Sequence, residues 1–211
     1  MKLVYPKTVE GIFNEIIKDE NVRDYLKELN LHHFQTYIHS LNVCFQAIDM
    51  GKKEGYEDED LVILGYCGLF HDIGKLYLDS ELINKKYDDL NKEQLNEFRQ
   101  IPRKAFLSLQ NLNYDFVAKV VISNYEFNKK YHCPRRKERR NKRRGDSYDR
   151  RKFDSKAHQF AQIISIANLY ENYVSINMNR NLNFSKINLN NYLQDEFTGD
   201  RSHIDNLMEK L

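Results

Sequence analysis

Apolar residues recur at spacings of three and four along most of the chain, and this spacing is typical of amphipathic α-helices. No run alternates between apolar and polar residues as a half-buried strand does, and no internal repeat is present. Only three prolines and eight glycines interrupt the 211 residues. The pattern predicts helices at residues 9–17, 22–31, 34–53, 58–76, 91–109, 114–129 and 153–177, and a closing helix from Ile204. We therefore expect an all-α fold.

The predicted helix at 58–76 differs from the others because it is apolar on nearly every side from Leu61 to Phe70. A helix of this kind is typical of the buried centre of a helical domain. Asn91 and Asn113 precede the next two predicted helices, and asparagine is a favoured N-cap residue.

Length and composition fit a single domain over residues 1–211, with residues 1–32 as a short N-terminal helical extension. The three cysteines are widely separated and odd in number, so we expect no disulfide framework and a reducing, cytoplasmic setting. The longest apolar run has half of the roughly 20 residues that a membrane span needs. Residues 1–6 lack the apolar stretch of a signal peptide. We expect no association with a membrane.

The net charge of +2 is distributed unevenly. Residues 135–152 contain eleven Lys and Arg against three acidic residues, a local charge of +8 that leaves −6 for the remainder. Such a density of like charge favours a solvated insertion loop. Arginine pairs with phosphate in a bidentate manner, so the loop is a candidate surface for phosphate groups or nucleic acid. The alternative is a charged insertion without a partner. The candidate contact residues are Arg139, Arg140, Arg143 and Arg144.

The strongest chemical signal lies at residues 70–75, which read Phe-His-Asp-Ile-Gly-Lys and end the apolar run. A histidine next to an aspartate offers an imidazole nitrogen and a carboxylate oxygen, which divalent metals of intermediate softness accept. A further histidine, His39, lies on the preceding predicted helix. The alternative is a set of buried polar residues that bond to one another in an empty cavity.

These residues and their spacing resemble the HD superfamily of metal-dependent phosphohydrolases, and specifically its HD-GYP branch. The resemblance runs from His39 to Ser175. Residues 71–75 stand intact where the family has its HD-x-G-K motif, and residues 80–85 resemble the segment that usually follows. Residues 166–171, Ile-Ala-Asn-Leu-Tyr-Glu, occupy the place of the family's I-A-D-x-Y-D. The resemblance implies an HD-domain helical bundle.

Two further segments keep the family's length but not its ligands. Residues 101–102 read Ile-Pro in place of His-Pro, and residues 124–134 fit a stretch that typically begins His-His-Glu. In the family, these histidines and the Asp of I-A-D-x-Y-D help to hold two or three metals. The replaced ligand positions are Ile101, Asn124, Tyr125 and Asn168. Isoleucine cannot coordinate a metal, and tyrosine does so only after losing a proton with a pKa near 10.

The resemblance therefore implies at most one divalent metal (Fe, Mn, Zn or Ni), and an empty site is the alternative. The ligand set would be His39, His71, Asp72 and Asn168. In the family the lysine of the HD motif helps to hold the phosphate, a role that falls here to Lys75. Asp72 and Lys75 are thus the candidate catalytic residues.

Three functions stay open. The first is a diverged HD-GYP-like protein with impaired catalysis, which acts as a binding or regulatory module for phosphate-bearing ligands or protein partners. The second is a mononuclear metal-dependent phosphohydrolase that acts on nucleotides or cyclic dinucleotides. Cyclic di-GMP is the substrate class that the resemblance suggests, although nothing in the retained residues selects it. The third is a nucleic-acid-binding protein that uses the 135–152 loop.

Overall fold

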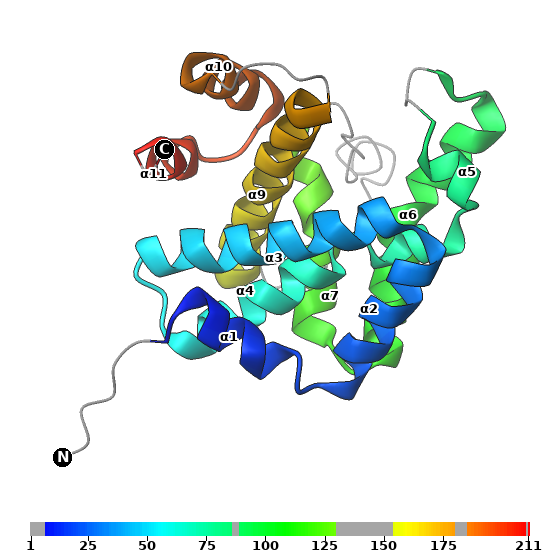
Figure 1. Cartoon of the computed structure of the whole chain (residues 1–211), viewed down its shortest axis with the longest axis horizontal. Coiled ribbons are helices and arrows are strands. Elements are labelled where there is room, and N and C mark those ends of the chain that lie inside the picture. The colour runs from blue at the N-terminus through cyan, green and yellow to red at the C-terminus, as the bar shows by residue number, and fades with distance from the viewer. Residues whose placement is uncertain (1–6, 86–88, 130–153, 180–184, 210) are drawn as a thin grey trace, which may run out of the picture.

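The computed structural model describes residues 7–85, 89–129, 154–179, 185–209 and 211, and these residues are arranged as a bundle of helices (Figure 1). The α-helices are α1 (Val9–Ile16), α2 (Glu20–His32), α3 (Phe34–Lys53), α4 (Asp58–Phe70), α5 (Ser80–Ile83), α6 (Lys92–Asn111), α7 (Asp115–Asn124), α9 (Ser155–Asn179), α10 (Lys186–Glu196) and α11 (Ser202–Met208). Two short 3₁₀ helices are η1 (Ile73–Tyr77) and η3 (Tyr125–Phe127). The described residues form no β-strand, and Asn128 and Phe197 make an isolated antiparallel bridge. The prediction of an all-α fold is confirmed.

Helix α4 lies at the centre of the bundle, packed against α1, α3, α7 and α9. The expectation from its all-round apolar sequence is confirmed, since buried residues occur on several sides of the helix. Gly65 is one of them, and a Cβ atom at this position would lie 2.2 Å from Ile16 of α1. The absence of a side chain therefore lets α1 pack closely on the central helix.

The predicted helix at 58–76 is wrong at its C-terminal end. Helix α4 ends at Phe70, and the backbone leaves the helical conformation at Asp72 before it enters the 3₁₀ helix η1. The reason is a close contact between η1 and α6: a Cβ atom on Gly74 would lie 2.3 Å from the carbonyl oxygen of Ile101. This contact joins distant parts of the chain, so the local apolar spacing did not indicate it.

Other element boundaries also differ from the predicted ones. The predicted helix at 114–129 ends at Asn124 and continues as η3, while α5 and the asparagine-rich helix α10 were not predicted. Asn91 is an N-cap in a capping box, as expected. Asn113 is not an N-cap, because it adopts a positive φ of 64° and Tyr114 precedes α7 instead.

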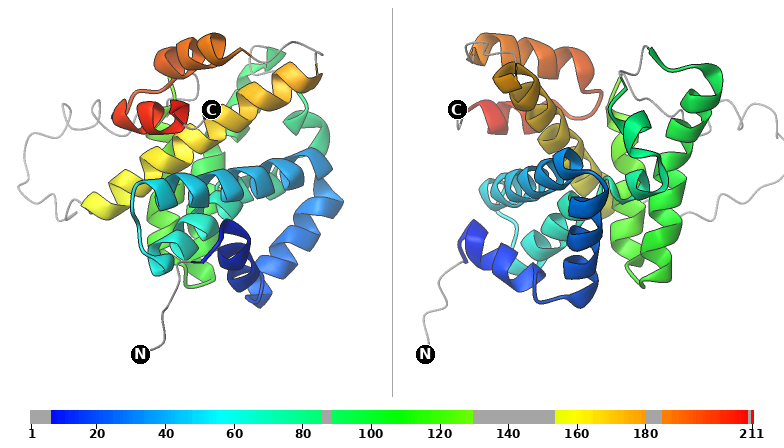
Figure 2. Two further views of the ribbon diagram at one scale, coloured as in Figure 1. Left: turned by 60° about the vertical axis from the view of Figure 1, so that its left-hand side comes forward. Right: turned by 45° about the vertical axis from the view of Figure 1, so that its right-hand side comes forward.

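Helices α1 and α2 share the core of the bundle. Their buried side chains include Ile12, Ile16 and Leu29, and the ring of Tyr25 lies 5.0 Å from that of Phe70 at the end of α4. Helices α10 and α11 lie at the opposite end of the molecule from α1 in both views of Figure 2. The division of the chain into an HD domain and a 1–32 extension stays a prediction, but the described part of that extension supports the end of α4.

None of the described helices combines the length and the apolar character needed to cross a lipid bilayer. The predicted basic loop at 135–152 lies outside the described residues.

Candidate metal centre

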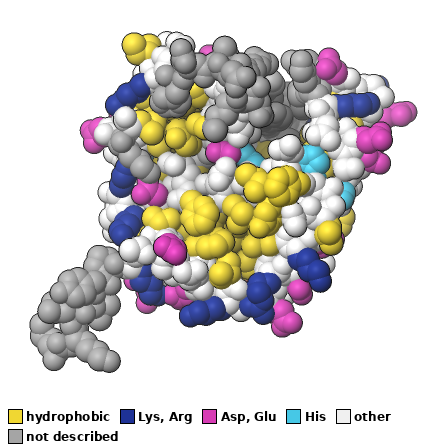
Figure 3. Space-filling view, in the orientation of Figure 1, with side chains coloured by type: hydrophobic (Ala, Val, Ile, Leu, Met, Phe, Trp, Pro, Cys, Tyr) yellow, Lys and Arg dark blue, Asp and Glu magenta, His cyan; other side chains and the backbone are white. Residues whose placement is uncertain are grey.

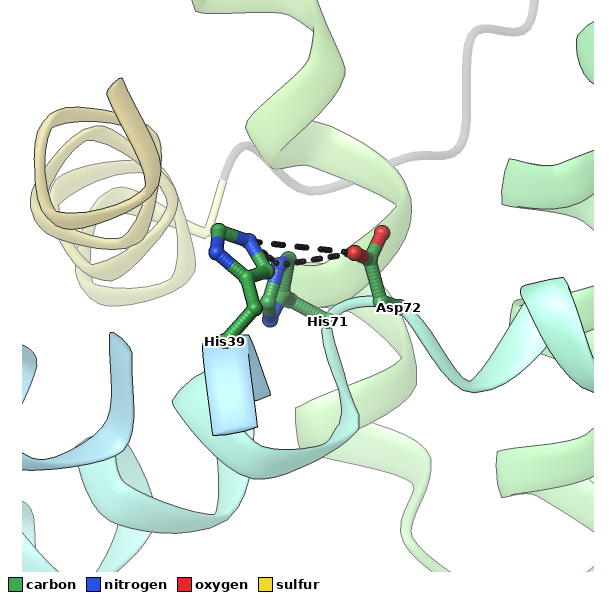
Figure 4. A group of neighbouring side chains, drawn as sticks. All are labelled: His39, His71 and Asp72. Carbon is green, nitrogen blue, oxygen red and sulfur yellow. Dashed lines mark hydrogen bonds and ion pairs between the residues drawn. The ribbon is translucent and has the colours of Figure 1, made fainter. Parts of the chain in front are cut away.

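Three side chains from two parts of the chain meet at the C-terminal end of α4 (Figure 4). His39 comes from α3, and His71 and Asp72 follow the last residue of α4. The Nε2 atoms of the two histidines lie 3.2 Å apart, and Asp72 Oδ2 lies 3.3 Å from His71 Nε2 and 3.8 Å from His39 Nε2. His71 and Asp72 are buried, and the side chain of His39 is 14% exposed. The structure thus brings together three of the four residues that the sequence predicted as ligands.

A close approach of two helices sets the distance between the histidines. A Cβ atom on Gly68 of α4 would lie 2.7 Å from the Cα atom of Cys44 of α3, so only glycine fits between the backbones here. Gly68 precedes His71 by three residues, and Cys44 follows His39 by five. The tight helix contact therefore lies beside the site and holds both imidazoles near each other.

The tautomer of His71 follows from its second ring nitrogen. His71 Nδ1 lies 2.7 Å from the carbonyl oxygen of Gly68. A carbonyl oxygen can only accept, so Nδ1 carries the proton and donates it. Whenever the ring is neutral, its lone pair is therefore on Nε2, which faces His39 and Asp72. This is the arrangement in which histidine binds metals, with the outer nitrogen fixed by a backbone acceptor.

Asn168 adds a fourth polar atom from α9. Its Oδ1 lies 3.0 Å from His39 Nε2 and accepts a hydrogen bond from Asn172 Nδ2 at 2.8 Å. The amide of Asn172, one turn further along α9, thereby turns the oxygen of Asn168 toward the histidine.

The donor set fits one divalent cation. A tetrahedral site with metal–ligand bonds of about 2.1 Å has its ligand atoms roughly 3.4 Å apart. The measured distances from His39 Nε2 to its three neighbours range from 3.0 to 3.8 Å. Two imidazoles, a carboxylate and an amide oxygen are ligands that Zn, Fe, Mn or Ni accept. A metal would be held by His39, His71, Asp72 and Asn168.

Residues 36–173 match the HD domain family. The chain belongs to this family. A search of curated proteins found no significant match. Among solved structures, the fold is similar to the HD domain of the phosphodiesterase PgpH from L. monocytogenes, solved in complex with cyclic-di-AMP. That structure has a TM-score of 0.61 and 14% sequence identity, over 88% of this chain and 92% of the other. At this identity, the likeness concerns the fold.

The lysine of this HD domain contacts the aspartate of the centre. Lys75 Nζ lies 2.5 Å from Asp72 Oδ2, the oxygen that faces the histidines. Burial alone would raise the pKa of Asp72, but His71 and the Lys75 ammonium outweigh burial and hold that pKa well below its usual range. Asp72 is therefore a carboxylate at neutral pH, as a metal ligand must be.

The imidazole of His39 is neutral under the same conditions. Burial, together with the neighbouring His71, lowers the pKa of His39 to about 3. A neutral ring has a lone pair available for a metal, and a protonated ring has none.

Tyr125 contacts the same aspartate from the side of η3. Its hydroxyl lies 3.3 Å from Asp72 Oδ1 and 3.5 Å from the carbonyl oxygen of His71. Because a carboxylate accepts, the tyrosine hydroxyl donates to it. Tyr125 thus acts as a hydrogen-bond donor to a candidate ligand, and its phenol stands where the resemblance places a histidine.

The other two replaced positions have become part of the packing. Ile101 is 3% exposed and belongs to an apolar cluster with Leu78, Leu82 and Leu90. Asn124 is buried, and its Nδ2 donates to the carbonyl oxygen of Val121 at 2.6 Å. The amide nitrogen of Asn124 therefore bonds within its own helix.

A row of polar side chains beside the centre was not predicted. On α9, Glu171 accepts hydrogen bonds from Asn42 of α3 at 2.7 Å and from Ser175 at 2.9 Å. Glu171 is 7% exposed, so these donors compensate its burial. The spacing of three and four from Asn168 through Glu171 and Asn172 to Ser175 is visible in the sequence. It could have indicated a polar stripe on one face of α9.

The four arginines proposed for phosphate contact lie outside the described residues. Binding of nucleic acid by the 135–152 loop stays a prediction. It requires an affinity that falls steeply with added salt and with the change of Arg139, Arg140, Arg143 and Arg144 to alanine.

Proposed function

We propose that this chain is an HD domain that holds one divalent metal, binds a phosphate-bearing ligand there and hydrolyses it poorly or not at all. The observation that supports the proposal best is the approach of His71 Nε2, Asp72 Oδ2 and Asn168 Oδ1 to within 3.8 Å of His39 Nε2. Each of these atoms has a lone pair for a cation when both histidines are neutral and the proton of His39 is on Nδ1.

The charge of the centre favours an anionic ligand. Asp72 carries the single formal negative charge among the four candidate ligands, whereas Lys75 adds a positive charge beside it. With a divalent cation bound, the centre would be net positive, and a phosphate group would compensate that charge. The side chain of Lys75 is 25% exposed, so its ammonium can reach a ligand that arrives from solvent.

Impaired hydrolysis is proposed because the described residues around the centre offer few groups for a second metal. In HD domains a divalent metal supplies Lewis acidity and makes water more acidic, and two metals together stabilise both the attacking and the leaving oxygen. Ile101 contributes no lone pair from its side chain, and the amide nitrogen of Asn124 bonds to Val121. Asn168 also lacks the negative charge that an aspartate would bring.

The assignment to the HD-GYP branch is part of the proposal. It rests on the spacing of the motifs along the sequence, from His39 to the segment at 166–171. The role of this branch in signalling through cyclic dinucleotides makes such compounds the first ligands to test. Cyclic-di-AMP is the ligand bound to the PgpH HD domain.

A mononuclear phosphohydrolase is the second candidate. The observation in its favour is the fixed tautomer of His71, whose Nδ1 donates to Gly68 and whose Nε2 faces the centre. This orientation presents the lone pair of His71 Nε2 to a metal, which a mononuclear phosphohydrolase requires.

Metal analysis tests the proposed centre. Protein purified without chelator should contain about one equivalent of Fe, Mn, Zn or Ni by plasma mass spectrometry. Asp72→Ala should lose this metal, whereas Asp24→Ala, which changes an exposed carboxylate on α2, should keep it. Trace metal that does not respond to Asp72→Ala would contradict the proposal.

Ligand binding and turnover distinguish the two candidates. Titration calorimetry with cyclic-di-AMP and cyclic di-GMP should show weaker binding to the Lys75→Gln variant than to the wild-type chain. The metal content of the variant should be unchanged. If the chain hydrolyses either compound or bis(4-nitrophenyl) phosphate, and this activity disappears in Asp72→Ala, the chain is a phosphohydrolase. Binding without turnover supports the impaired module.

A further inference from the structure

The outer face of α3 is apolar and exposed. Phe34 is 58% exposed, Ile38 is 37% exposed and Phe45 is 36% exposed, and Leu41 between them is half-buried. Residues 34–48 contain no Lys, Arg, Asp or Glu. Figure 3 shows hydrophobic side chains gathered in the middle of the face that α3 crosses, with charged side chains around them. An apolar centre inside a charged rim is typical of a protein–protein interface.

The apolar face extends to the neighbouring helix. The ring of Phe45 lies 4.7 Å from the ring of Phe13 on α1. At the other end of α3, the ring of Phe34 stacks on Tyr37 at 6.1 Å, and Leu31 of α2 is 79% exposed. The patch therefore continues onto α1, and a further exposed apolar side chain lies three residues before α3 begins.

The spacing along α3 matches a helix–helix seam. Phe34, Ile38, Leu41 and Phe45 are separated by four, three and four residues. This is the 3.5-residue repeat with which two helices pack side by side. A helix that only covers its own core does not need such a stripe on its outer side.

We propose that this stripe packs against the same stripe of a second copy of the chain. In a two-fold symmetric pair the patch packs against itself, so it must be complementary to its own composition. A charge-free apolar stripe is complementary to itself, whereas a charged surface would bury its charges against it without a partner. A second copy is therefore a better occupant than a charged partner.

The charges at the helix end favour an antiparallel pair. Lys52 and Lys53 lie in the last turn of α3. Parallel α3 helices would place these lysines next to those of the other copy and would align the helix dipoles. In the antiparallel pair, Phe34 of one copy packs against Phe45 of the other, and Ile38 packs against Leu41.

Sedimentation velocity tests the pair. Between about 1 and 100 µM, the wild-type chain should shift to twice the 25.3 kDa mass of one chain. Phe34→Glu should remain monomeric, because it places a charge at the seam. Its exposed position and the favourable effect of an acidic residue in a first helical turn keep the fold intact, which circular dichroism checks. Ile187→Glu, at a 73% exposed apolar residue of α10, is the matched control and should still dimerise.

A wild-type chain that stays monomeric over this range overturns the proposal, and so does a Phe34→Glu variant that still dimerises. Disulfide trapping then tests the direction of packing in a Cys133→Ser background, since Cys44 and Cys67 are buried. A mixture of Phe34→Cys and Phe45→Cys chains should form the mixed disulfide. Cross-linking of Phe34→Cys chains with one another instead would overturn the antiparallel arrangement.

Discussion

The two sides of the candidate centre have different surroundings. On the side of α3 and α9, His39 and Asn168 direct polar atoms toward His71 and Asp72. On the side of α6, Ile101 is buried among leucines, where the resemblance to HD-GYP proteins places a histidine. Ligand positions can thus be replaced in two ways. Ile101 has become part of the core, whereas Asn168 still directs a polar atom toward the centre.

The difference lies in the supporting contacts. His71 is held by the carbonyl oxygen of Gly68, and Asn168 is held by Asn172. Such outer contacts orient ligands and make a site more rigid. On the other side, the backbone of Ile101 touches Gly74 instead. One side of the centre is therefore organised around lone pairs, and the other is organised around close packing. The following variants test this contrast.

Gly74→Ala should have the largest effect on stability. The new Cβ atom would meet the carbonyl oxygen of Ile101, a backbone atom that cannot move alone, and we expect a loss of about 3 kcal/mol. Urea denaturation measures this loss. Gly55→Ala is the control: no atom lies within 4 Å of its new Cβ, and its positive φ of 81° accounts for a loss of about 1 kcal/mol. Equal losses for both variants would show that the packing of η1 on α6 is not tight.

Ile101→His should not restore a metal ligand. An imidazole in the leucine cluster lacks hydrogen-bond partners, so we expect a loss of about 2 kcal/mol in the free energy of unfolding. Ile101→Val, which keeps the apolar character, should lose about 1 kcal/mol. Metal content should not increase in either variant. A second equivalent of metal in Ile101→His would contradict the view that packing has replaced coordination.

Asn168→Asp should strengthen metal binding. A carboxylate 3.0 Å from His39 Nε2 adds a negative charge to the ligand set, and we expect affinity to rise about tenfold, or about 1.4 kcal/mol. Competition with a chromogenic chelator measures this change. Asn177→Asp, on the same helix, is the matched control and should have no effect. Unchanged affinity in Asn168→Asp would remove Asn168 from the ligand set.

Tyr125→Phe should have the smallest effect. It removes the hydroxyl that donates to Asp72 Oδ1 and keeps the ring, so we expect a loss of about 1 kcal/mol in thermal or urea denaturation. Metal content should stay the same, because Asp72 Oδ2 faces the histidines. A complete loss of metal in this variant would make Tyr125 part of the metal centre itself.

Much of the fold follows from local sequence. The spacing of apolar residues identified α3, α6 and α9 within a few residues, and the apolar run of α4 identified the buried centre. Helix α10 was missed because asparagine-rich sequences have low helix propensity, and Leu189 and Leu193 find their apolar partners only in the folded chain.

The sequence by itself determined the helical class, the central helix and the motif residues His39, His71 and Asp72, since each depends on spacing along the chain. The tertiary structure alone decided where α4 ends, how Gly68 brings the two histidines together and how Asn172 orients Asn168. It also decided that Ile101 packs in an apolar cluster. These features depend on contacts between helices that are distant in sequence, and periodicity along one segment carries no information about such contacts.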